Sequence, residues 1–272
     1  MKAISKPSLW LYNITDNKSI LKSNVDKEWC VASLAKLMTG MVVIDHTENF
    51  SDPVEMDTTP IMYLRDLEGW PLEERPMAYV NGVFCHDGNY NAVKPIPFVI
   101  PTGTYTKDEL LKATLSPGDN YATETLSLAC KTPDENFIVT MNKKAKALGM
   151  TRTNFTSSHG CTGDDVSTIE DMHLMSLETL KYDKLKECST LRRFSYKGME
   201  LENLNLHLME LFEKANTKMV VVKTGFSEVG GLHILVVFEH KDKLYNAIVL
   251  GAHNWQNRKH IVEKLLYSFI TR

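Results

Sequence analysis

Strand-like patterns of apolar and polar residues occur at the two ends of the chain. Residues 9–14 alternate, a polar turn follows, and residues 20–23 can return as the second strand of a hairpin. Three runs rich in β-branched and aromatic residues lie near the other end: 219–223, 232–239 and 244–251. After them, the apolar spacing of residues 258–270 predicts an amphipathic closing helix.

The middle of the chain shows helical spacing instead. Apolar residues recur there every three to four positions, which predicts helices over residues 32–45, 107–115, 121–130, 134–148 and 168–180. Gly149 follows the fourth helix and is suited to cap it, because glycine readily adopts the left-handed conformation common at helix C-termini. Residues 49–100, rich in Pro, Gly, Asp and Asn, predict an irregular excursion.

Terminal strands around a helical middle predict an α+β fold. The length of 272 residues suits one large domain or two intimate subdomains. A chain with 43% hydrophobic and 24% charged residues can bury such a core.

Charge and cysteine usage argue against several classes of protein. The formal net charge of -3 gives no basic footprint, so we expect neither nucleic acid nor an acidic membrane surface as the main partner. No apolar run approaches the roughly 20 residues of a membrane span, and no secretory signal is visible. The five cysteines, without C-x-x-C spacing, argue against a zinc site or a disulfide framework.

The first stretch with candidate chemistry is Ser33-Leu34-Ala35-Lys36. A serine and a lysine three positions apart on a helix share one face, so the amine could take the proton of an otherwise unreactive hydroxyl. The apolar neighbours Leu34, Leu37 and Met38 would desolvate the amine and favour its neutral form. Taken alone, the pair is better explained as a helix N-cap followed by a solvated lysine.

Two further motifs follow in order. Gly118-Asp119-Asn120 alone predicts a turn, although the Asn120 amide could accept a hydrogen bond from a lysine and donate one to a substrate carbonyl. Lys223-Thr224-Gly225 lies on a β-rich run. A lysine charge and a threonine hydroxyl there suit a carboxylate, and a glycine lets a substrate backbone come close.

Together with their flanks, these motifs resemble the D-alanyl-D-alanine carboxypeptidases, which are penicillin-binding proteins of the β-lactamase and transpeptidase superfamily. Residues 31–40 are similar to the family's nucleophile helix, with Val31 and Ala35 in place of its proline and threonine. The resemblance covers nearly the whole chain and is weakest over residues 49–100. It implies the superfamily fold, an antiparallel sheet built from the N- and C-terminal segments and flanked by helices, with a mainly helical subdomain inserted. A single domain would span residues 1–272, with the sheet subdomain at about 1–32 and 215–272 and the helical subdomain at about 33–214. Because the chain stops after one terminal helix, we expect no extra C-terminal β domain such as many members have.

The resemblance also implies a serine peptidase without metal or cofactor that acts on D-Ala-D-Ala peptides of peptidoglycan and is inhibited covalently by β-lactams. Ser33 would attack the penultimate D-Ala carbonyl and Lys36 would take its proton. Lys223 and Thr224 would hold the terminal carboxylate, and the backbone N–H groups of Ser33 and Phe226 would form the oxyanion hole. The expected catalytic residues are Ser33, Lys36 and Asn120, and the expected substrate-binding residues are Lys223, Thr224, Gly225, Phe226 and Ser227.

The second motif departs from the family pattern. Gly118 stands where the family has a serine, whose hydroxyl would relay a proton to the leaving amine. Three alternatives stay open: Ser116 supplies the hydroxyl, a water fills the space, or peptide turnover is slow or absent. Two other functions remain in view. A β-lactamase is disfavoured by Leu201, which stands at the position of the class A deacylating glutamate, whereas Gly118 favours a binding protein that has lost turnover.

Histidines and targeting signals add little to this interpretation. His159 lies in a segment that the family uses structurally, and no acidic partner for a Ser-His-Asp triad is identifiable. The other histidines lack metal-binding spacing. The substrate implies the periplasm or the cell wall, but no export signal is visible, so the location stays unassigned. One hypothesis is a phage protein released on lysis, and another is a cytoplasmic hydrolase with a changed role.

Overall fold

An antiparallel five-stranded sheet forms the centre of the fold, in the order β11-β12-β13-β1-β2. The computed structural model describes residues 6–56, 83–84, 96–97, 102–134, 136–196, 199–227 and 229–270. The sheet strands are β1 (Ser8–Asn13), β2 (Lys18–Ser23), β11 (Lys218–Ser227), β12 (Gly231–His240) and β13 (Lys243–Ala252). The first strand pairs with β13, so the two ends of the chain meet in one sheet and β11 is left at an edge.

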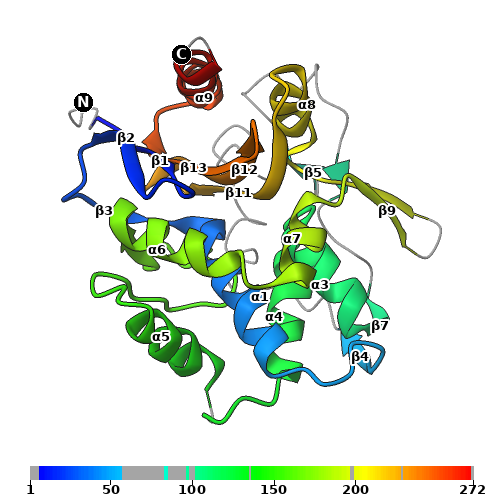
Figure 1. Ribbon diagram of the computed structural model, residues 1–272. Coiled ribbons are helices and arrows are strands. Elements are labelled where there is room, and N and C mark those ends of the chain that lie inside the picture. Colours follow the sequence, from blue (N-terminus) through cyan, green and yellow to red (C-terminus); the bar gives the residue numbers. More distant parts are fainter. Residues whose placement is uncertain are drawn as a thin grey trace, which may run out of the picture.

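Helices cover both faces of this sheet (Figure 1). On one face lie α8 (Leu206–Lys214) and α9 (Trp255–Ile270). On the other side lie α1 (Ala35–Asp45), α3 (Lys107–Leu115), α4 (Asn120–Ala129), α5 (Phe137–Ala147), α6 (Ile169–Thr179) and α7 (Asp183–Thr190). The predicted α+β class, with a sheet from both chain ends and a helical part inserted, is confirmed.

Each face of the sheet has its own core. Side chains along a strand alternate between faces, so neighbours on β11 enter different clusters. Val221 packs with the cluster of the helical part, whereas Val222 packs with residues of α8 and α9. The same alternation places Lys223 toward the helical part and Thr224 toward α8.

The C-terminus of α5 shows why the chain leaves that helix at Gly149. Gly149 has a φ of +80°, a left-handed conformation that costs a residue with a side chain about 1 kcal/mol or more. Its N–H donates to the Lys146 carbonyl, and the N–H of Met150 donates to that of Ala145, both at 3.0 Å. These two bonds form a Schellman motif, which confirms the predicted cap.

Several elements are additional to those predicted. Neither α7 nor α8 was expected, and α1 is preceded by a short 3-10 turn, η1 (Ala32–Leu34). Short strands pair as β3 (Glu28–Cys30) with β8 (Val166–Thr168), β4 (Pro53–Met56) with β7 (Gly103–Thr106), β5 (Val83–Phe84) with β6 (Ile96–Pro97), and β9 (Arg193–Tyr196) with β10 (Met199–Glu202). Most of the predicted excursion at 49–100 lies outside the described residues.

No helix in the described part of the chain is long and apolar enough to cross a bilayer.

Candidate active site

Ser33 lies in a tight 3-10 turn rather than within the α-helix predicted for it. Ala32 precedes it with a φ of +49°, which is unusual for a residue with a Cβ. The strained residue is buried, and the turn presents Ser33 half-buried at the start of α1. Side chains three residues apart eclipse in a 3-10 turn, so Lys36 still lies above Ser33 as the spacing predicts.

Two glycines from distant segments hold this turn by close backbone contact. A Cβ on Gly160 would lie 2.0 Å from the Ala32 carbonyl oxygen, and one on Gly225 would lie 3.0 Å from that of Val31 and 3.2 Å from the Ser33 nitrogen. A Cβ at Gly160 therefore cannot be accommodated without moving the turn. The glycine of the third motif packs directly against the backbone that carries Ser33.

The amine of Lys36 joins the first two motifs. Its Nζ lies 2.9 Å from Ser33 Oγ, 2.7 Å from Asn120 Oδ1 and 2.6 Å from the His159 carbonyl oxygen. The side chain is fully buried, and burial lowers the Lys36 pKa against the opposing pull of Cys161, Asp119 and Asp165. A lysine that titrates below its usual range is suited to act as a base.

A polar loop after α5 supplies the His159 carbonyl and is tied down at both ends. Thr39, one turn along α1 from Lys36, donates to the Ser158 carbonyl at 2.5 Å. Asp165 accepts from the backbone N–H groups of Thr156 and Ser157, and its own carbonyl accepts from Val31 at 2.8 Å. The acceptor for Lys36 is therefore fixed to the same segment that carries Ser33.

The His159 ring is held within this loop. Its Nδ1 accepts from the Cys161 N–H at 3.1 Å, so the proton of the neutral ring sits on Nε2, 3.9 Å from a Glu124 carboxylate oxygen. Burial, followed by the nearby Lys36 charge, lowers the His159 pKa to about 3. The ring thus stays neutral near pH 7, and the hydrogen bond to Lys36 comes from the backbone of this residue.

The second motif begins α4. Asp119 caps that helix by accepting from the Ala122 N–H at 2.9 Å, and Asn120 follows, buried, with its Oδ1 on Lys36. Gly118 has a φ of +79°, and its N–H donates to the Ala113 carbonyl at the end of α3 at 3.0 Å. The backbone conformation at this position favours glycine, which gives a physical reason for the missing serine.

The hydroxyl of Ser116 is turned away from this region. It donates to the Leu191 carbonyl at 3.0 Å, and the side chain is fully buried. The Ser116 carbonyl in turn accepts from the Leu204 N–H at 3.3 Å. Ser116 would have to break the bond to Leu191 before it could replace the hydroxyl missing at Gly118.

The third motif lies on the edge strand β11. Lys223 is fully buried, and its Nζ donates to the Thr224 carbonyl at 3.1 Å. Burial is the main cause that lowers the Lys223 pKa to about 7, and the positive charges of Lys36 and Arg258 add to it. Arg258 reaches the sheet from α9 and donates to the His233 carbonyl at 3.2 Å. Cys161 opposes this shift, and no Asp or Glu in the described part of the chain forms an ion pair with Lys223, which is suited to pair with an incoming anion.

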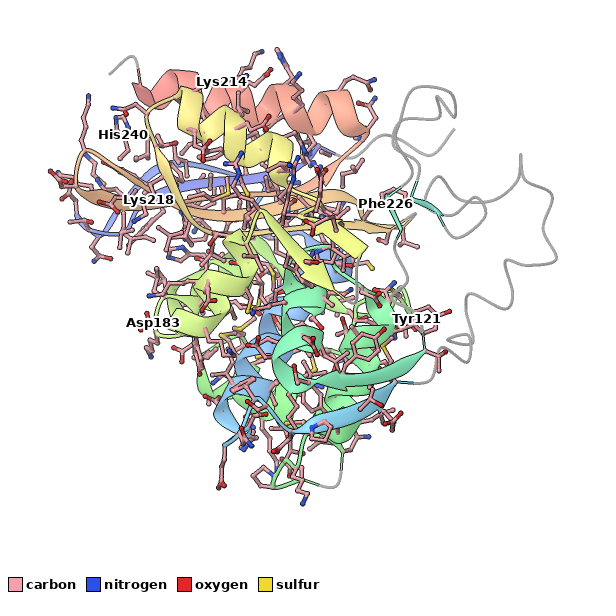
Figure 2. The ribbon with its side chains drawn as sticks, turned by 90° about the vertical axis from the view of Figure 1, so that its right-hand side faces the viewer. Tyr121, Asp183, Lys214, Lys218, Phe226 and His240 are labelled. Atoms are coloured by element: carbon pink, nitrogen blue, oxygen red, sulfur yellow. The ribbon has the colours of Figure 1, made fainter. Side chains whose placement is uncertain are left out.

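The end of β11 completes the candidate site. Figure 2 shows Lys218 and Phe226 at opposite ends of this strand, with Phe226 and Tyr121 of α4 toward the same side of the molecule. Ser227 donates to the Cys30 sulfur at 3.3 Å and accepts from the Gly230 N–H at 2.9 Å. Cys30 ends β3, directly before the turn that carries Ser33, so these bonds tie the third motif to the first.

The described cysteines are free thiols at positions 30, 130, 161 and 188. Cys85 lies outside the described residues. Within the described ranges, no three His, Cys, Asp or Glu side chains gather as metal ligands.

Comparison with known proteins places this site in a family. A family model described as D-alanyl-D-alanine carboxypeptidase matches residues 86–254, more than half of the chain. The chain belongs to that family. The matched region contains the second and third motifs, while Ser33 and Lys36 precede it. The family identified from the motifs is thus confirmed.

Individual relatives include peptidases of two kinds. A D-alanyl-D-alanine endopeptidase of Escherichia coli K12 is 28% identical over 238 residues, which are 86% of this chain and 67% of that protein. D-alanyl-D-alanine carboxypeptidase DacF of Bacillus subtilis is 28% identical over 62% of this chain and 44% of its own length. Membership therefore identifies a serine peptidase of the D-Ala-D-Ala class without fixing which bond it cleaves.

A solved structure shows the same fold. Penicillin-binding protein D2 from Listeria monocytogenes, in its ampicillin-bound form, matches with a TM-score of 0.72 and 23% identity, over 97% of this chain and 96% of that chain. The fold implied by the motifs, that of the transpeptidase superfamily, is confirmed.

Two contacts in the site were not predicted from the sequence, although residues 158–160 and 203–205 both lie in segments that resemble the family. The His159 carbonyl has no side-chain signature, although the neighbouring Gly160 was a usable signal of close backbone contact. Asn205 accepts from the Thr224 hydroxyl at 2.8 Å, and nothing in the sequence connects these two residues.

Proposed function

We propose that this protein is a D-alanyl-D-alanine carboxypeptidase that works through an acyl-enzyme on Ser33. The observation that carries the proposal is the position of Lys36 Nζ within hydrogen-bond distance of Ser33 Oγ, Asn120 Oδ1 and the His159 carbonyl. Only one of these three groups, the hydroxyl, can give up a proton to the amine.

The three contacts of Lys36 define the direction of proton transfer. A charged lysine donates three hydrogen bonds, whereas the neutral amine has two N–H groups and one lone pair. The two carbonyl oxygens of Asn120 and His159 can only accept, so they take the two N–H groups. The lone pair is then left facing Ser33 Oγ, where it accepts the proton as the hydroxyl attacks the penultimate D-Ala carbonyl.

The remaining parts of the reaction use the third motif. The Lys223 ammonium attracts the terminal carboxylate of the substrate, and Thr224 donates a hydrogen bond to it. The N–H groups of Ser33 and Phe226 stabilise the oxyanion. Gly225 keeps the edge of β11 close to Ser33, and Ser227 fastens the end of that strand beside β3. Water then hydrolyses the acyl-enzyme after D-alanine has left.

Efficient β-lactamase activity is not supported by the site. Leu201 lies on β10 with 2% exposure and packs in the apolar core, so this position offers no base for deacylation. We therefore expect penicillin to act as a slowly released inhibitor.

The proposal is tested by product analysis. A peptide ending in D-Ala-D-Ala should release free D-alanine, whereas a cross-linked peptide dimer should be cleaved slowly or not at all. Cleavage of the cross-link alone would identify an endopeptidase, like the Escherichia coli relative. Covalent penicillin labelling without release of D-alanine would instead identify a binding protein that has lost turnover.

Gly118→Ser should raise peptide turnover by about tenfold, because the new hydroxyl can protonate the leaving amine, a role typically worth ~10²-fold. A D-alanyl thioester should gain much less, since a thiolate leaves without a proton. Gly118→Ala is the matched control. It imposes the same strain at a φ of +79°, roughly 1–2 kcal/mol, without the hydroxyl.

Ser116→Ala tests whether the neighbouring serine supplies the hydroxyl that Gly118 lacks. We expect little change in turnover, because the Ser116 hydroxyl is engaged with the Leu191 carbonyl. A large loss in Ser116→Ala would show that Ser116 has taken over the relay. If neither Gly118→Ser nor Ser116→Ala changes peptide turnover while Ser33 still acylates, the proton reaches the leaving amine through water or from Lys36 alone.

A further inference from the structure

The buried amide of Asn205 is the polar group beside the site that the proposed reaction leaves without a role. Asn205 is the N-cap residue of α8 and is fully buried, yet its side chain caps none of the described N–H groups of that helix. Asparagine is a preferred N-cap because its side-chain oxygen can accept from the first turn. Here that oxygen accepts from the hydroxyl of Thr224 at 2.8 Å.

The segment that carries this amide is held firmly. The Asn205 N–H donates to Asn203 Oδ1 at 2.9 Å, and Asn203 Nδ2 donates to the carbonyls of Ser189 and Leu191, each at 2.9 Å. The backbone of Asn205 is thus fixed to the end of α7, and rotation of its side chain is the remaining freedom. Its Nδ2 finds no hydrogen-bond partner among the residues described.

The direction of this hydrogen bond matters because a threonine hydroxyl has one proton. When Thr224 donates to Asn205 Oδ1, it has only lone pairs to offer to an arriving carboxylate, which it would repel. Turning the amide by half a rotation exchanges Oδ1 and Nδ2. The amide then donates to Thr224 Oγ1 through the N–H that lacks a partner, and the hydroxyl proton becomes available to the carboxylate.

We propose that Asn205 is a positioning residue that sets the direction of the Thr224 hydroxyl, and that its amide turns when a substrate carboxylate binds. In the bound state, the Asn205 amide donates a hydrogen bond to the Thr224 hydroxyl, and that hydroxyl donates one to the carboxylate. The inference rests on the proposed function, because it requires a substrate carboxylate at Thr224. By this role, Asn205 would favour acylation by reagents that carry the carboxylate over acylation by reagents that lack it.

The test compares two reagents that acylate Ser33. Penicillin carries the carboxylate, and an aryl ester of an N-acyl-D-alanine lacks it. Asn205→Asp keeps the shape of the side chain but offers only acceptors when ionised, so it holds the Thr224 proton in the unproductive direction. The acylation rate with penicillin, relative to that with the ester, should fall about tenfold or more, as for loss of a hydrogen bond to a charged group.

Two control variants separate this role from general damage. Asn203→Asp makes the same chemical change two residues away and loses the bonds to two carbonyls, so it should lower the melting temperature while the ratio of the two rates stays constant. Asn205→Ala lets the Thr224 hydroxyl rotate freely, so its penicillin-to-ester rate ratio should fall less than that of Asn205→Asp. If Asn205→Asp fails to fold, Asn205→Ala takes its place in the comparison with the parent protein. A larger fall in the alanine variant overturns the proposal.

Thr224→Val shows whether Asn205 acts through Thr224. In that background Asn205→Asp should leave the ratio unchanged, because the hydroxyl is gone. A further fall there would mean that the new charge repels the carboxylate directly, and an unchanged ratio in the parent background would mean that Asn205 has no such role. If neither reagent acylates the parent protein, the proposed function itself has failed, and that result is seen before any Asn205 variant is made.

Discussion

Replacing Ser33 with alanine is expected to abolish both covalent labelling by penicillin and release of D-alanine. The reason is that the attacking oxygen is removed, while Lys36 keeps its hydrogen bonds to Asn120 and His159. In the parent protein, mass spectrometry should find a single penicillin adduct in the peptide that contains Ser33. Chelators should leave labelling unchanged, since no step proposed here uses a metal.

Ser127→Ala is the matched control for this experiment. Ser127 lies on α4 and is buried like much of the site, but its hydroxyl donates to the Glu124 carbonyl at 2.8 Å within its own helix. We expect that variant to be labelled as the parent is. An adduct that persists in Ser33→Ala would show that another residue is the nucleophile.

Lys223→Ala should reduce acylation by carboxylate-bearing reagents by about 100-fold or more, the range found when one partner of a buried charge pair is removed. The carboxylate-free aryl ester should lose much less. Folding should suffer little from loss of the charge, because burial and the charges of Lys36 and Arg258 disfavour the ionised form of Lys223. Second-order acylation rates and melting temperatures test the two effects separately.

Lys218→Ala, on the same strand but exposed, is the control and should match the parent (Figure 2). If the melting temperature and all acylation rates of Lys223→Ala fell together, Lys223 would be a structural residue.

The ratio of the acylation rate with penicillin to that with the carboxylate-free ester should depend on pH, because the pKa of Lys223 is lowered to about 7. Below about 7 the group is an ammonium that attracts the carboxylate, and above it the charge is lost. The rate with penicillin relative to the ester should therefore fall as pH rises through about 7. Both reactions need neutral Lys36, so the ratio cancels that requirement, and it should be flat in Lys223→Ala. A ratio that rises with pH contradicts this assignment.

Periodicity predicted the strands and long helices well because they bury continuous faces. The missed helices are short. In α7, Leu185 and Cys188 are buried among charged residues, so the apolar stripe is too narrow to stand out. In α8, Leu208, Met209 and Phe212 do follow helical spacing, and this signal was available. The pairing of β3 with β8 depends on contacts between distant segments, which spacing within one segment cannot show.

Motif chemistry found the side chains of the candidate site but not how they are held. The spacing of Ser33 and Lys36 allowed a pair but did not decide for it, and the flanking residues with their family resemblance did; the contact between the two side chains agrees with that pairing. The turn around Ser33 is set instead by Gly160 and Gly225 pressing on its backbone. Likewise Thr224 faces α8 and Lys223 faces the helical part, which follows from strand alternation once the strand is placed between them.

The contacts that tie the motifs together also decide when the protein can first be active during its synthesis. Lys36 meets a carbonyl 123 residues later in the chain, and Cys30 meets a hydroxyl 197 residues later. A nascent chain that has emerged only as far as α6 contains Ser33 and Lys36 but not β11, the strand proposed to receive the substrate. Such non-local closure is slow, so reactivity toward penicillin would report the last stage of folding. An incompletely folded molecule would not react with penicillin.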